Sequence, residues 1–396
     1  MSRKATYAFY ISKLLQEPFV ALYPMMAVLL TKEMGATPFQ VAVLTMLKPT
    51  VSILSFYWSS SLLWRHHLLK ANLVLATGLA VLPFLFAAWI DHVWLFIAAG
   101  ASYSLFWRAG IPALMELLRI NTKDHEEIFS RASSFSYAIG VLAAMTYGFL
   151  LDLHPTWWKA LFAVSAVTSL TSVIFLLRFE SPKPKKISSD PSITTFLTHP
   201  WKAALQLLQA KPAFFRFQLG FFIAGFGLML AMPAIPGFLG ALDLSYTKLF
   251  LSLSVLQGLG FILSSPLWTS WLKRVPIHSL SISVFLSFSL FLVALLLCIF
   301  HPSWIFLAYL IYGIAQAESH LVWNLSGTLF AQEESSAQYS SVSVLTIGLR
   351  GLIAPPLGGL LAQYGSPEIC LTVGSLMCVA GGYYMAVTRE PGRAVS

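Results

Sequence analysis

The sequence predicts an all-α integral membrane protein whose twelve transmembrane helices form two pseudo-symmetric bundles of six. Three observations lead to this fold class. The 396 residues are 57% hydrophobic and only 10% charged, with a mean hydropathy of +0.74, whereas a water-soluble domain carries about 25% charged residues. Apolar stretches long enough to cross a bilayer recur twelve times along the chain. The two halves of the chain also repeat each other in a constant register.

The twelve apolar stretches are bounded by glycine, proline or charged residues, and each has the length of about 20 residues that a spanning helix needs. The predicted spans are 7–30, 38–63, 71–90, 93–117, 130–151, 157–178, 213–239, 247–271, 277–300, 304–329, 337–363 and 367–388.

Basic residues predict the orientation. With an even number of spans both termini share a side, and the loops on that side hold eighteen Lys and Arg residues, against Lys32, Lys159 and Lys248 on the other. Both termini are therefore expected in the cytoplasm, in a multi-pass protein of the cell membrane. The net charge of +9 then reflects topology and contact with anionic lipid. Nucleic-acid binding is not expected, because no loop combines a basic stripe with aromatic residues.

The longest polar interval predicts the domain organisation. An N-terminal six-helix bundle is expected at 1–179, a cytoplasmic linker at 180–212, and a C-terminal six-helix bundle at 213–396. Within the linker, PKPKKISSDPS is typical of a flexible basic segment, and HPWKAALQLLQAK of a short amphipathic helix on the membrane surface.

The two halves repeat at an offset of 209 residues, which indicates a parallel duplication. In this register ILSFYWSSSLLWR falls on ILSSPLWTSWLKR, so that Arg65 matches Arg274 without a gap. In the same register Lys48 falls on Gln257.

With these features the chain resembles the major facilitator superfamily. GLRGLIAPPLGGLLAQYG is similar to that family's eleventh helix, and PALMELLRINTKDHEEIFSRASSFSYAIG is similar to its loop into helix five, with Arg131 at the basic position. The resemblance implies transport by alternating access and a central cavity lined mainly by helices 1, 4, 7 and 10. It also implies gate or loop roles for Arg65, Arg131 and Arg274. All lining residues can come from one chain, so a monomer is expected.

Ionisable residues deep in the predicted spans are the candidate functional groups, because a charge at mid-bilayer depth costs at least about 2.5–3.5 kcal/mol. They occur in predicted helices 1, 2, 4, 10 and 11, and helices 3, 6, 9 and 12 have none. They are Lys13, Glu17, Lys48, Arg108, Glu318, His320 and Arg350.

Four of these groups are cations and two are carboxylates, and a positive cavity focuses anions. We therefore expect the substrate to be a small organic anion, either a carboxylate or a phosphate ester. Lys48 is the foremost candidate ligand, since it is central, flanked by serines and without an acidic residue on its own helix. The other candidate ligands are Arg108, Arg350, Lys13, Gln316, His320, Asn324 and Gln257.

Proton coupling is expected through Glu17, His320 or Glu318, because carboxyl and imidazole groups inside a membrane can exchange protons. Each residue also has a structural alternative. Glu318 faces an apolar stripe and can have a fixed partner, either Arg350 or Arg108. His320 can be a hydrogen-bonded structural histidine.

Lys13 and Glu17 are four residues apart on one stripe of the first helix, so they can also be no more than an intrahelical ion pair. Pro18 lacks a backbone N–H and therefore predicts a local break in this helix beside Glu17.

Other functions stay open at this point. The aromatic content of 14% also fits export of lipophilic compounds, and a receptor without turnover would show the same charges. An enzyme is not expected, and neither is a metal or another cofactor, because the sequence contains no metal-ligand spacing, no GxSxG and no phosphate-cradling glycine loop.

Overall fold

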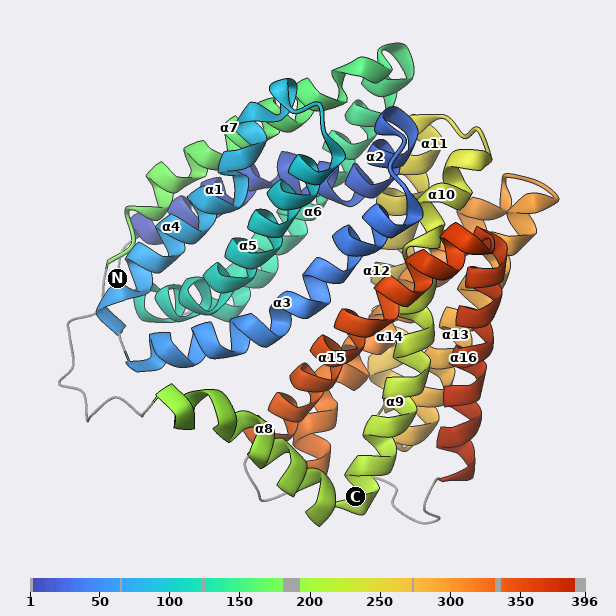
Figure 1. The fold of residues 1–396 in the computed structure, drawn as a ribbon. Coiled ribbons are helices and arrows are strands. Elements are labelled where there is room, and N and C mark those ends of the chain that lie inside the picture. Colours follow the sequence, from blue (N-terminus) through green and yellow to red (C-terminus); the bar gives the residue numbers. More distant parts are fainter. Residues whose placement is uncertain are drawn as a thin grey trace. The chain divides into compact units, whose positions relative to one another are not determined.

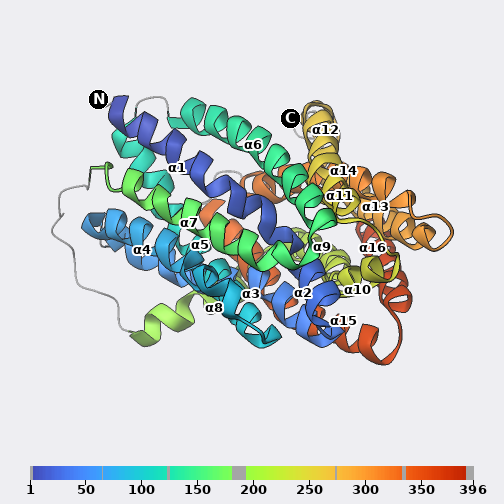
Figure 2. The same cartoon turned by 90° about the horizontal axis from the view of Figure 1, so that it is seen from above.

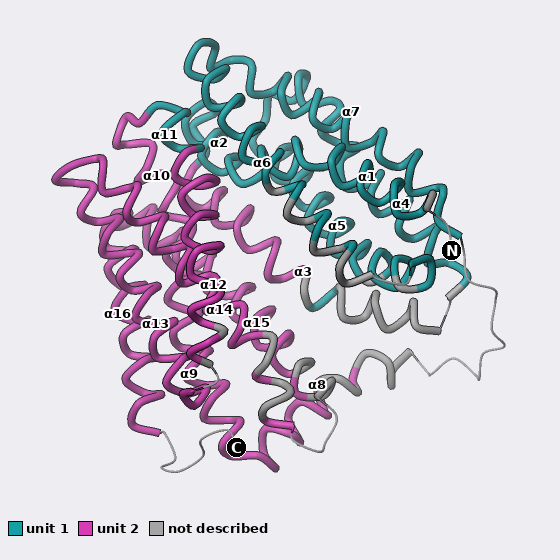
Figure 3. The backbone as a smooth tube through the Cα atoms, turned by 180° about the vertical axis from the view of Figure 1, so that it is seen from behind, with its two compact units in different colours: residues 1–36, 53–192, 245–250 teal, residues 37–52, 193–244, 251–396 magenta. Residues whose placement is uncertain are grey.

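Figure 1 shows the computed structural model of the chain, which describes residues 3–64, 66–122, 125–180, 193–272, 274–331 and 336–388. These residues form helices and no strand, in agreement with the predicted all-α class. Their contacts divide the chain into unit 1, residues 1–36, 53–192 and 245–250, and unit 2, residues 37–52, 193–244 and 251–396 (Figure 3). The predicted bundle boundaries come from sequence alone and stay a prediction.

Nine helices among the described residues are long and apolar enough to cross a membrane, and each matches a predicted span. They are Ala5–Met34, Leu69–Trp89, Pro155–Leu176, Pro212–Ala231, Tyr246–Trp268, Ile277–Ile299, Trp304–Trp323, Val342–Tyr364 and Pro367–Val387. The other three predicted spans lie in helices of 27, 29 and 29 residues, which are α3 (Pro38–Trp64), α5 (Val93–Asn121) and α6 (His125–Leu153). The total of twelve spans stays a prediction.

Unit 1 is built around α1, which lies beside α6 and α7 in both views (Figures 1 and 2), while α4 packs on α5 and α7. Buried Phe9, Leu73, Leu117 and Phe179 form one of its apolar clusters. Besides α5, α6 and the second part of α3, its elements are α1 (Arg3–Leu22), η1 (Tyr23–Met25), α2 (Met26–Met34), η2 (His66–Leu68), α4 (Leu69–Val81), η3 (Leu82–Trp89), η4 (Pro155–Trp157), α7 (Trp158–Leu176) and α11 (Tyr246–Phe250).

The predicted break at Pro18 is wrong. Helix α1 continues through Pro18 as far as Leu22, and the 3-10 turn η1 forms around Pro24 instead. A membrane helix tolerates an internal proline where neighbouring helices and small backbone adjustments satisfy the freed carbonyl group. The first span is therefore helical on both sides of Glu17.

The N-terminus of α11 is held in unit 1 by the ends of α2 and α6. The Asp152 carboxylate accepts hydrogen bonds from the backbone N–H of Tyr246 (2.5 Å) and of Thr247 (3.0 Å). The Tyr246 hydroxyl donates to Glu33, and Lys32 Nζ lies 4.8 Å from the centre of the Tyr246 ring. Asp152 therefore caps a helix N-terminus, where negative charge is favourable. We call these interactions the α11 contact.

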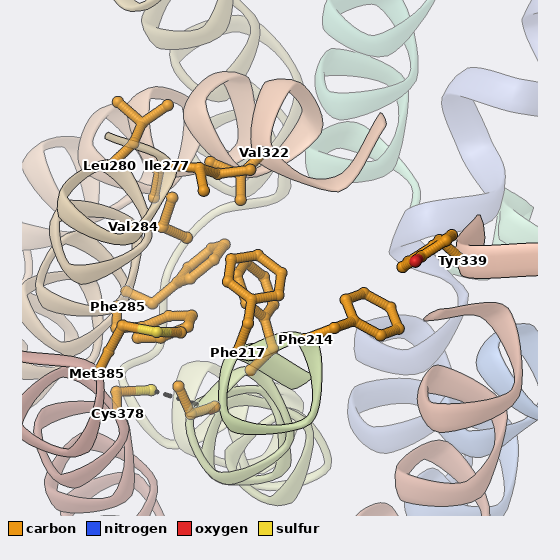
Figure 4. Packing of buried hydrophobic residues seen from close by; sticks show 14 of the residues in the cluster. Phe214, Phe217, Ile277, Leu280, Val284, Phe285, Val322, Tyr339, Cys378 and Met385 are labelled. Atoms are coloured by element: carbon orange, nitrogen blue, oxygen red, sulfur yellow. Dashed lines mark hydrogen bonds between the residues drawn. The ribbon is translucent and has the colours of Figure 1, made fainter. Parts of the chain in front are cut away.

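The core of unit 2 lies where α9, α13 and α16 meet (Figure 4). Phe221 of α9 and Phe285 of α13 pack edge to face, with ring centres 4.8 Å apart. Cys378 of α16 donates its thiol to the Ala224 carbonyl, the dashed line in Figure 4. Besides the first part of α3, the elements of unit 2 are α8 (Ile193–Ala210), α9 (Pro212–Ala231), α10 (Ala234–Ala241), the π-helical turn η5 (Leu251–Leu256), α12 (Gln257–Leu272), α13 (Ile277–Leu296), η6 (Leu297–Ile299), α14 (Trp304–Ala331), α15 (Ser336–Tyr364) and α16 (Pro367–Val387).

Helix α8 contains the predicted amphipathic segment and begins earlier than expected, at Ile193. It packs on α9 and α15. The basic stretch PKPKKISSDPS lies outside the described residues.

Candidate functional site

Unit 1 contains a cavity of about 140 Å³ between α1 and α5, with α4 and α7 completing its wall. Lys13, a predicted substrate ligand, belongs to this wall. The lining residues are Phe9, Ser12, Lys13, Gln16, Leu73, Thr77, Phe106, Trp107, Gly110, Ile111, Leu114, Met115 and Leu176. We call it the unit 1 cavity.

The hydrogen bonds of Gln16 determine which face of α1 is turned toward this cavity. Its amide nitrogen donates to Ser12 Oγ (3.1 Å) and to Ser172 Oγ of α7 (2.9 Å), and its side chain is buried. A buried amide needs such partners, since an unsatisfied polar group in a membrane interior costs several kcal/mol. The bonds therefore set the rotation of α1 and bring Lys13 to the cavity wall.

Thr77 of α4 contributes a second polar group to the wall. Its side chain is only 6% exposed. A hydroxyl group can both donate and accept a hydrogen bond, so Thr77 can contact a polar ligand in the cavity.

Glu17 interacts electrostatically with Lys13, as the intrahelical pair predicts, and it packs against α6. A Cβ atom built on Gly140 of α6 would lie 2.7 Å from Glu17 Oε1. The carboxylate therefore occupies space that only a glycine at this position leaves open.

Aromatic side chains join α1 to α5 beyond the cavity. The Tyr23 hydroxyl lies 3.1 Å from Ser104 Oγ, and the Tyr23 and Tyr103 ring centres are 4.2 Å apart. Tyr103 stacks in turn on Trp107 of the cavity wall, at 5.5 Å. The wall is therefore supported by a packed aromatic row.

Gln257 and Gln316, both predicted ligands, meet in unit 2. The Gln257 amide donates to Gln316 Oε1 at 2.9 Å, between α12 and α14. Gly313 permits this approach, because a Cβ atom there would lie 2.8 Å from the Gln257 carbonyl carbon. Gln257 also follows directly after the π-helical turn η5, a feature that is frequent at functional sites.

Lys48 and His320 lie within electrostatic range of each other, because Lys48 acts on the His320 imidazole. Both side chains are exposed, and the His320 ring packs edge to face with Phe261, with ring centres 5.6 Å apart. Tyr312, one turn before Gln316, interacts with the Gln316 amide. Unit 2 therefore gathers Lys48, His320, Gln257 and Gln316, which we call the unit 2 polar cluster.

Arg350 is buried at 8% exposure and faces α9. Its guanidinium donates to the Phe221 carbonyl at 2.5 Å, and its Nε has no hydrogen-bond partner among the described residues. On the same face of α15, Ser343 accepts a hydrogen bond from Gln218 of α9 at 2.7 Å. Arg350 therefore joins α15 to α9 through a hydrogen bond in this structure.

Glu318 is 0% exposed, in line with its predicted apolar surroundings. Ser283 of α13 interacts with the carboxyl group, but neither carboxyl oxygen has a partner at hydrogen-bond geometry within the described part of the chain. The predicted fixed partner is not found there, since neither Arg350 nor Arg108 forms an ion pair with Glu318. An ionised carboxylate without a partner is costly in such surroundings.

The remaining predicted site residues are placed as follows. Arg108 is exposed on α5, Arg131 is exposed on α6, and Arg274 is exposed after α12. Arg65 and the side chain of Asn324 lie outside the described residues.

Sequence reasoning missed Thr77, Gln16 and Asp152. A signal existed for Gln16, because Ser12 and Gln16 are four residues apart beside Lys13 and therefore share a helix face. Thr77 and Asp152 have no comparable pattern, and only the packing of α4 and α11 reveals them.

Comparison with known proteins gives a family and a fold. The family profile described as Major Facilitator Superfamily matches residues 18–349. No curated protein sequence matches significantly.

Several solved structures are similar along nearly the whole chain. A mutant of the nucleoside transporter NupG has a TM-score of 0.79 at 13% identity, covering 97% of this chain and 100% of that one. A POT family transporter in complex with a thioalcohol conjugated peptide has a TM-score of 0.71 at 13% identity, with coverages of 97% and 96%. A bacterial homolog to the human lysosomal transporter Spinster has a TM-score of 0.60 at 14% identity, with coverages of 98% and 96%. At these identities the likeness concerns the fold alone.

Proposed function

We propose that this chain, which belongs to the Major Facilitator Superfamily, is a secondary transporter that moves a small organic anion by alternating access. Its fold is that of membrane transporters. The anion is a carboxylate or a phosphate ester, and its movement is coupled to protons.

The accessible charges of the described residues support an anionic substrate. Lys48 and Arg108 have exposed side chains, and Lys13 lines the unit 1 cavity. Glu318 is fully buried, so it contributes no accessible negative charge. Glu17 offsets part of the Lys13 charge. The accessible groups inside the predicted spans therefore keep a positive surplus, which favours an anion.

The observation that carries the proposal is Lys48 in the unit 2 polar cluster. An ammonium group inside a predicted span lies within electrostatic range of His320, and one turn before His320 on α14 Gln316 is hydrogen-bonded to Gln257. A lysine at this depth is expensive unless it serves a pathway or a ligand. The amides and the imidazole can fix the orientation of an anion that the ammonium attracts.

Proton coupling is assigned to Glu318, Glu17 or His320. The buried Glu318 carboxyl group, without a hydrogen-bond partner among the described residues, is compatible with a protonated state in this conformation. Glu17 can take up a proton when its interaction with Lys13 is broken, and the His320 imidazole is the third candidate proton carrier.

The test is uptake into liposomes that contain the purified protein. The labelled compounds are carboxylates, phosphate esters, an organic cation, a nucleoside and a dipeptide, the last two because nucleoside and peptide transporters share the fold. We expect anion uptake that rises with an inward proton gradient. Lys48→Ala is expected to lower it about 10- to 100-fold, the effect of losing a charged hydrogen bond.

Two further variants control this experiment. Lys48→Arg keeps the charge and should retain part of the uptake, and Lys202→Ala removes an exposed lysine of α8 and should leave uptake unchanged. Uptake of the cation, the nucleoside or the dipeptide in place of anions contradicts the proposal. Export of lipophilic dyes that is unaffected by Lys48→Ala would establish the export function instead.

A further inference from the structure

The unit 1 cavity has four polar side chains in an otherwise apolar wall. Lys13, Thr77, Ser12 and Gln16 supply its polar side chains. The other lining side chains are aliphatic or aromatic, with Phe106 and Trp107 on α5 among them. Ligand pockets generally combine an apolar lining with a few placed polar groups.

These polar side chains offer hydrogen-bond donors. Lys13 presents an ammonium group, whose charge Glu17 offsets in part, and Thr77 presents a hydroxyl group. Ser12 Oγ accepts from Gln16, so its own proton remains to be donated. The thirteen lining residues include neither Asp nor Glu. An ammonium and a hydroxyl together match the two oxygen atoms of a carboxylate.

The cavity volume limits the size of the ligand. At about 140 Å³ it is close to the cavities of about 150 Å³ that hold one benzene molecule. One six-membered ring fits this space. Two contacts support the wall, because Gln16 bonds α1 to α7 and Trp107 stacks on Tyr103.

We propose that the unit 1 cavity is a binding site for a compact aromatic or alicyclic monocarboxylate of about the size of benzoate. The ring occupies the apolar part beside Phe106 and Trp107, and the carboxylate contacts Lys13 and Thr77. This site shares no residue with the unit 2 polar cluster. Its ligand is an anion of the class in the proposed function, so the inference rests on that function for the transport step, whereas binding can be measured without transport.

The test measures binding of labelled benzoate to the full chain in lipid nanodiscs. Three compounds serve as competitors. Acetate lacks the ring of benzoate, benzamide lacks its charge, and 2-naphthoate has two fused rings. We expect benzoate to bind at least about 10-fold more tightly than each competitor, as a site with a charged and an apolar part requires.

Variants then locate the site. Thr77→Val removes a hydroxyl at nearly constant volume, and Lys13→Gln removes the charge, so each should weaken benzoate binding about 10-fold. Thr171→Val is the matched control, since the exposed Thr171 hydroxyl donates to the Thr168 carbonyl and does not line the cavity. Unliganded melting temperatures show that each variant is folded.

A filling variant gives the sharpest outcome. Ile111→Trp replaces a side chain of the cavity wall, at a partly exposed position, by an indole ring and should abolish benzoate binding. Leu95→Trp introduces the same ring at an exposed position on the same helix, outside the cavity, and should leave benzoate binding unchanged. Benzoate binding that survives Ile111→Trp overturns this site.

The site and the proposed transport can fail separately. Anion uptake that neither Ile111→Trp nor Thr77→Val alters overturns the site and keeps the proposed function. Benzoate binding that depends on Thr77, together with no uptake of any anion, keeps the site and overturns the proposed transport.

Discussion

Lys13 of unit 1 and Arg350 of unit 2 are both cations inside predicted spans, yet their surroundings differ. Lys13 lines a cavity whose wall also contains the polar side chains of Ser12, Gln16 and Thr77. Arg350 is buried against α9, with its guanidinium on the Phe221 carbonyl. A count of charged residues therefore overstates the charge that a substrate can reach. Lys13 lines a cavity, whereas Arg350 holds two helices together.

The largest expected effect comes from Arg350→Leu, which removes a buried hydrogen bond between α15 and α9 and leaves a void. We expect a loss of about 2–4 kcal/mol in the free energy of unfolding, followed as a lower melting temperature in detergent. Arg274→Leu, at an exposed position, should have little effect. If Arg350→Leu melts like the parent protein and loses anion binding, Arg350 is a substrate ligand and the contrast with Lys13 disappears.

Gly140→Ala tests the packing beside the Lys13–Glu17 pair. The added Cβ atom would lie 2.7 Å from Glu17 Oε1, so the carboxylate or α6 must move, at a cost of about 1–3 kcal/mol. Gly78→Ala is the matched control, since its nearest neighbour, Leu170, is 3.9 Å away. Equal melting temperatures for the two variants would show that Glu17 is not fixed in this position.

Gln16→Leu tests how far the cavity depends on the orientation of α1. The variant removes the hydrogen bonds to Ser12 and Ser172 and should lower the free energy of unfolding by about 1–2 kcal/mol. Benzoate binding should weaken with it, because Lys13 loses its fixed place. Unchanged benzoate binding in a less stable variant would show that the cavity does not depend on the hydrogen bonds of Gln16.

Glu318→Gln is expected to have the smallest effect on stability, below about 1 kcal/mol, because the carboxyl group has no hydrogen-bond partner to lose among the described residues. Its effect on function is larger. If Glu318 carries the coupled proton, exchange of substrate across the liposome membrane persists, and the response of uptake to a pH gradient is lost. An unchanged response assigns the coupling to Glu17 or His320.

Several parts of this arrangement were predictable. Hydropathy was sufficient to locate helices such as Leu69–Trp89, because lipid requires long apolar segments. Gln316 was named as a candidate ligand, the repeat aligned Gln257 with Lys48, and the two glutamines meet at 2.9 Å. The apolar stripe around Glu318 predicted its burial.

Partners across helices were not predictable. Arg350 bonds a backbone carbonyl, and since every residue carries one, no side-chain pattern identifies Phe221. Glu17 depends on the missing side chain of Gly140. Thr77 belongs to the cavity wall only because of the way α4 packs in unit 1.

The α11 contact has a consequence for biosynthesis. Tyr246 and its partner Glu33 are separated by 213 residues, although both belong to unit 1. At a synthesis rate of about 5–20 residues per second, roughly 10–40 s pass between the emergence of the two residues from the ribosome. Asp152 precedes Tyr246 by 94 residues, and it has no helix N-terminus to cap until Tyr246 has emerged. Unit 1 therefore cannot be completed until part of the second half of the protein has been inserted, and a truncated chain ending before Tyr246 would leave it unfinished for a quality-control protease to recognise.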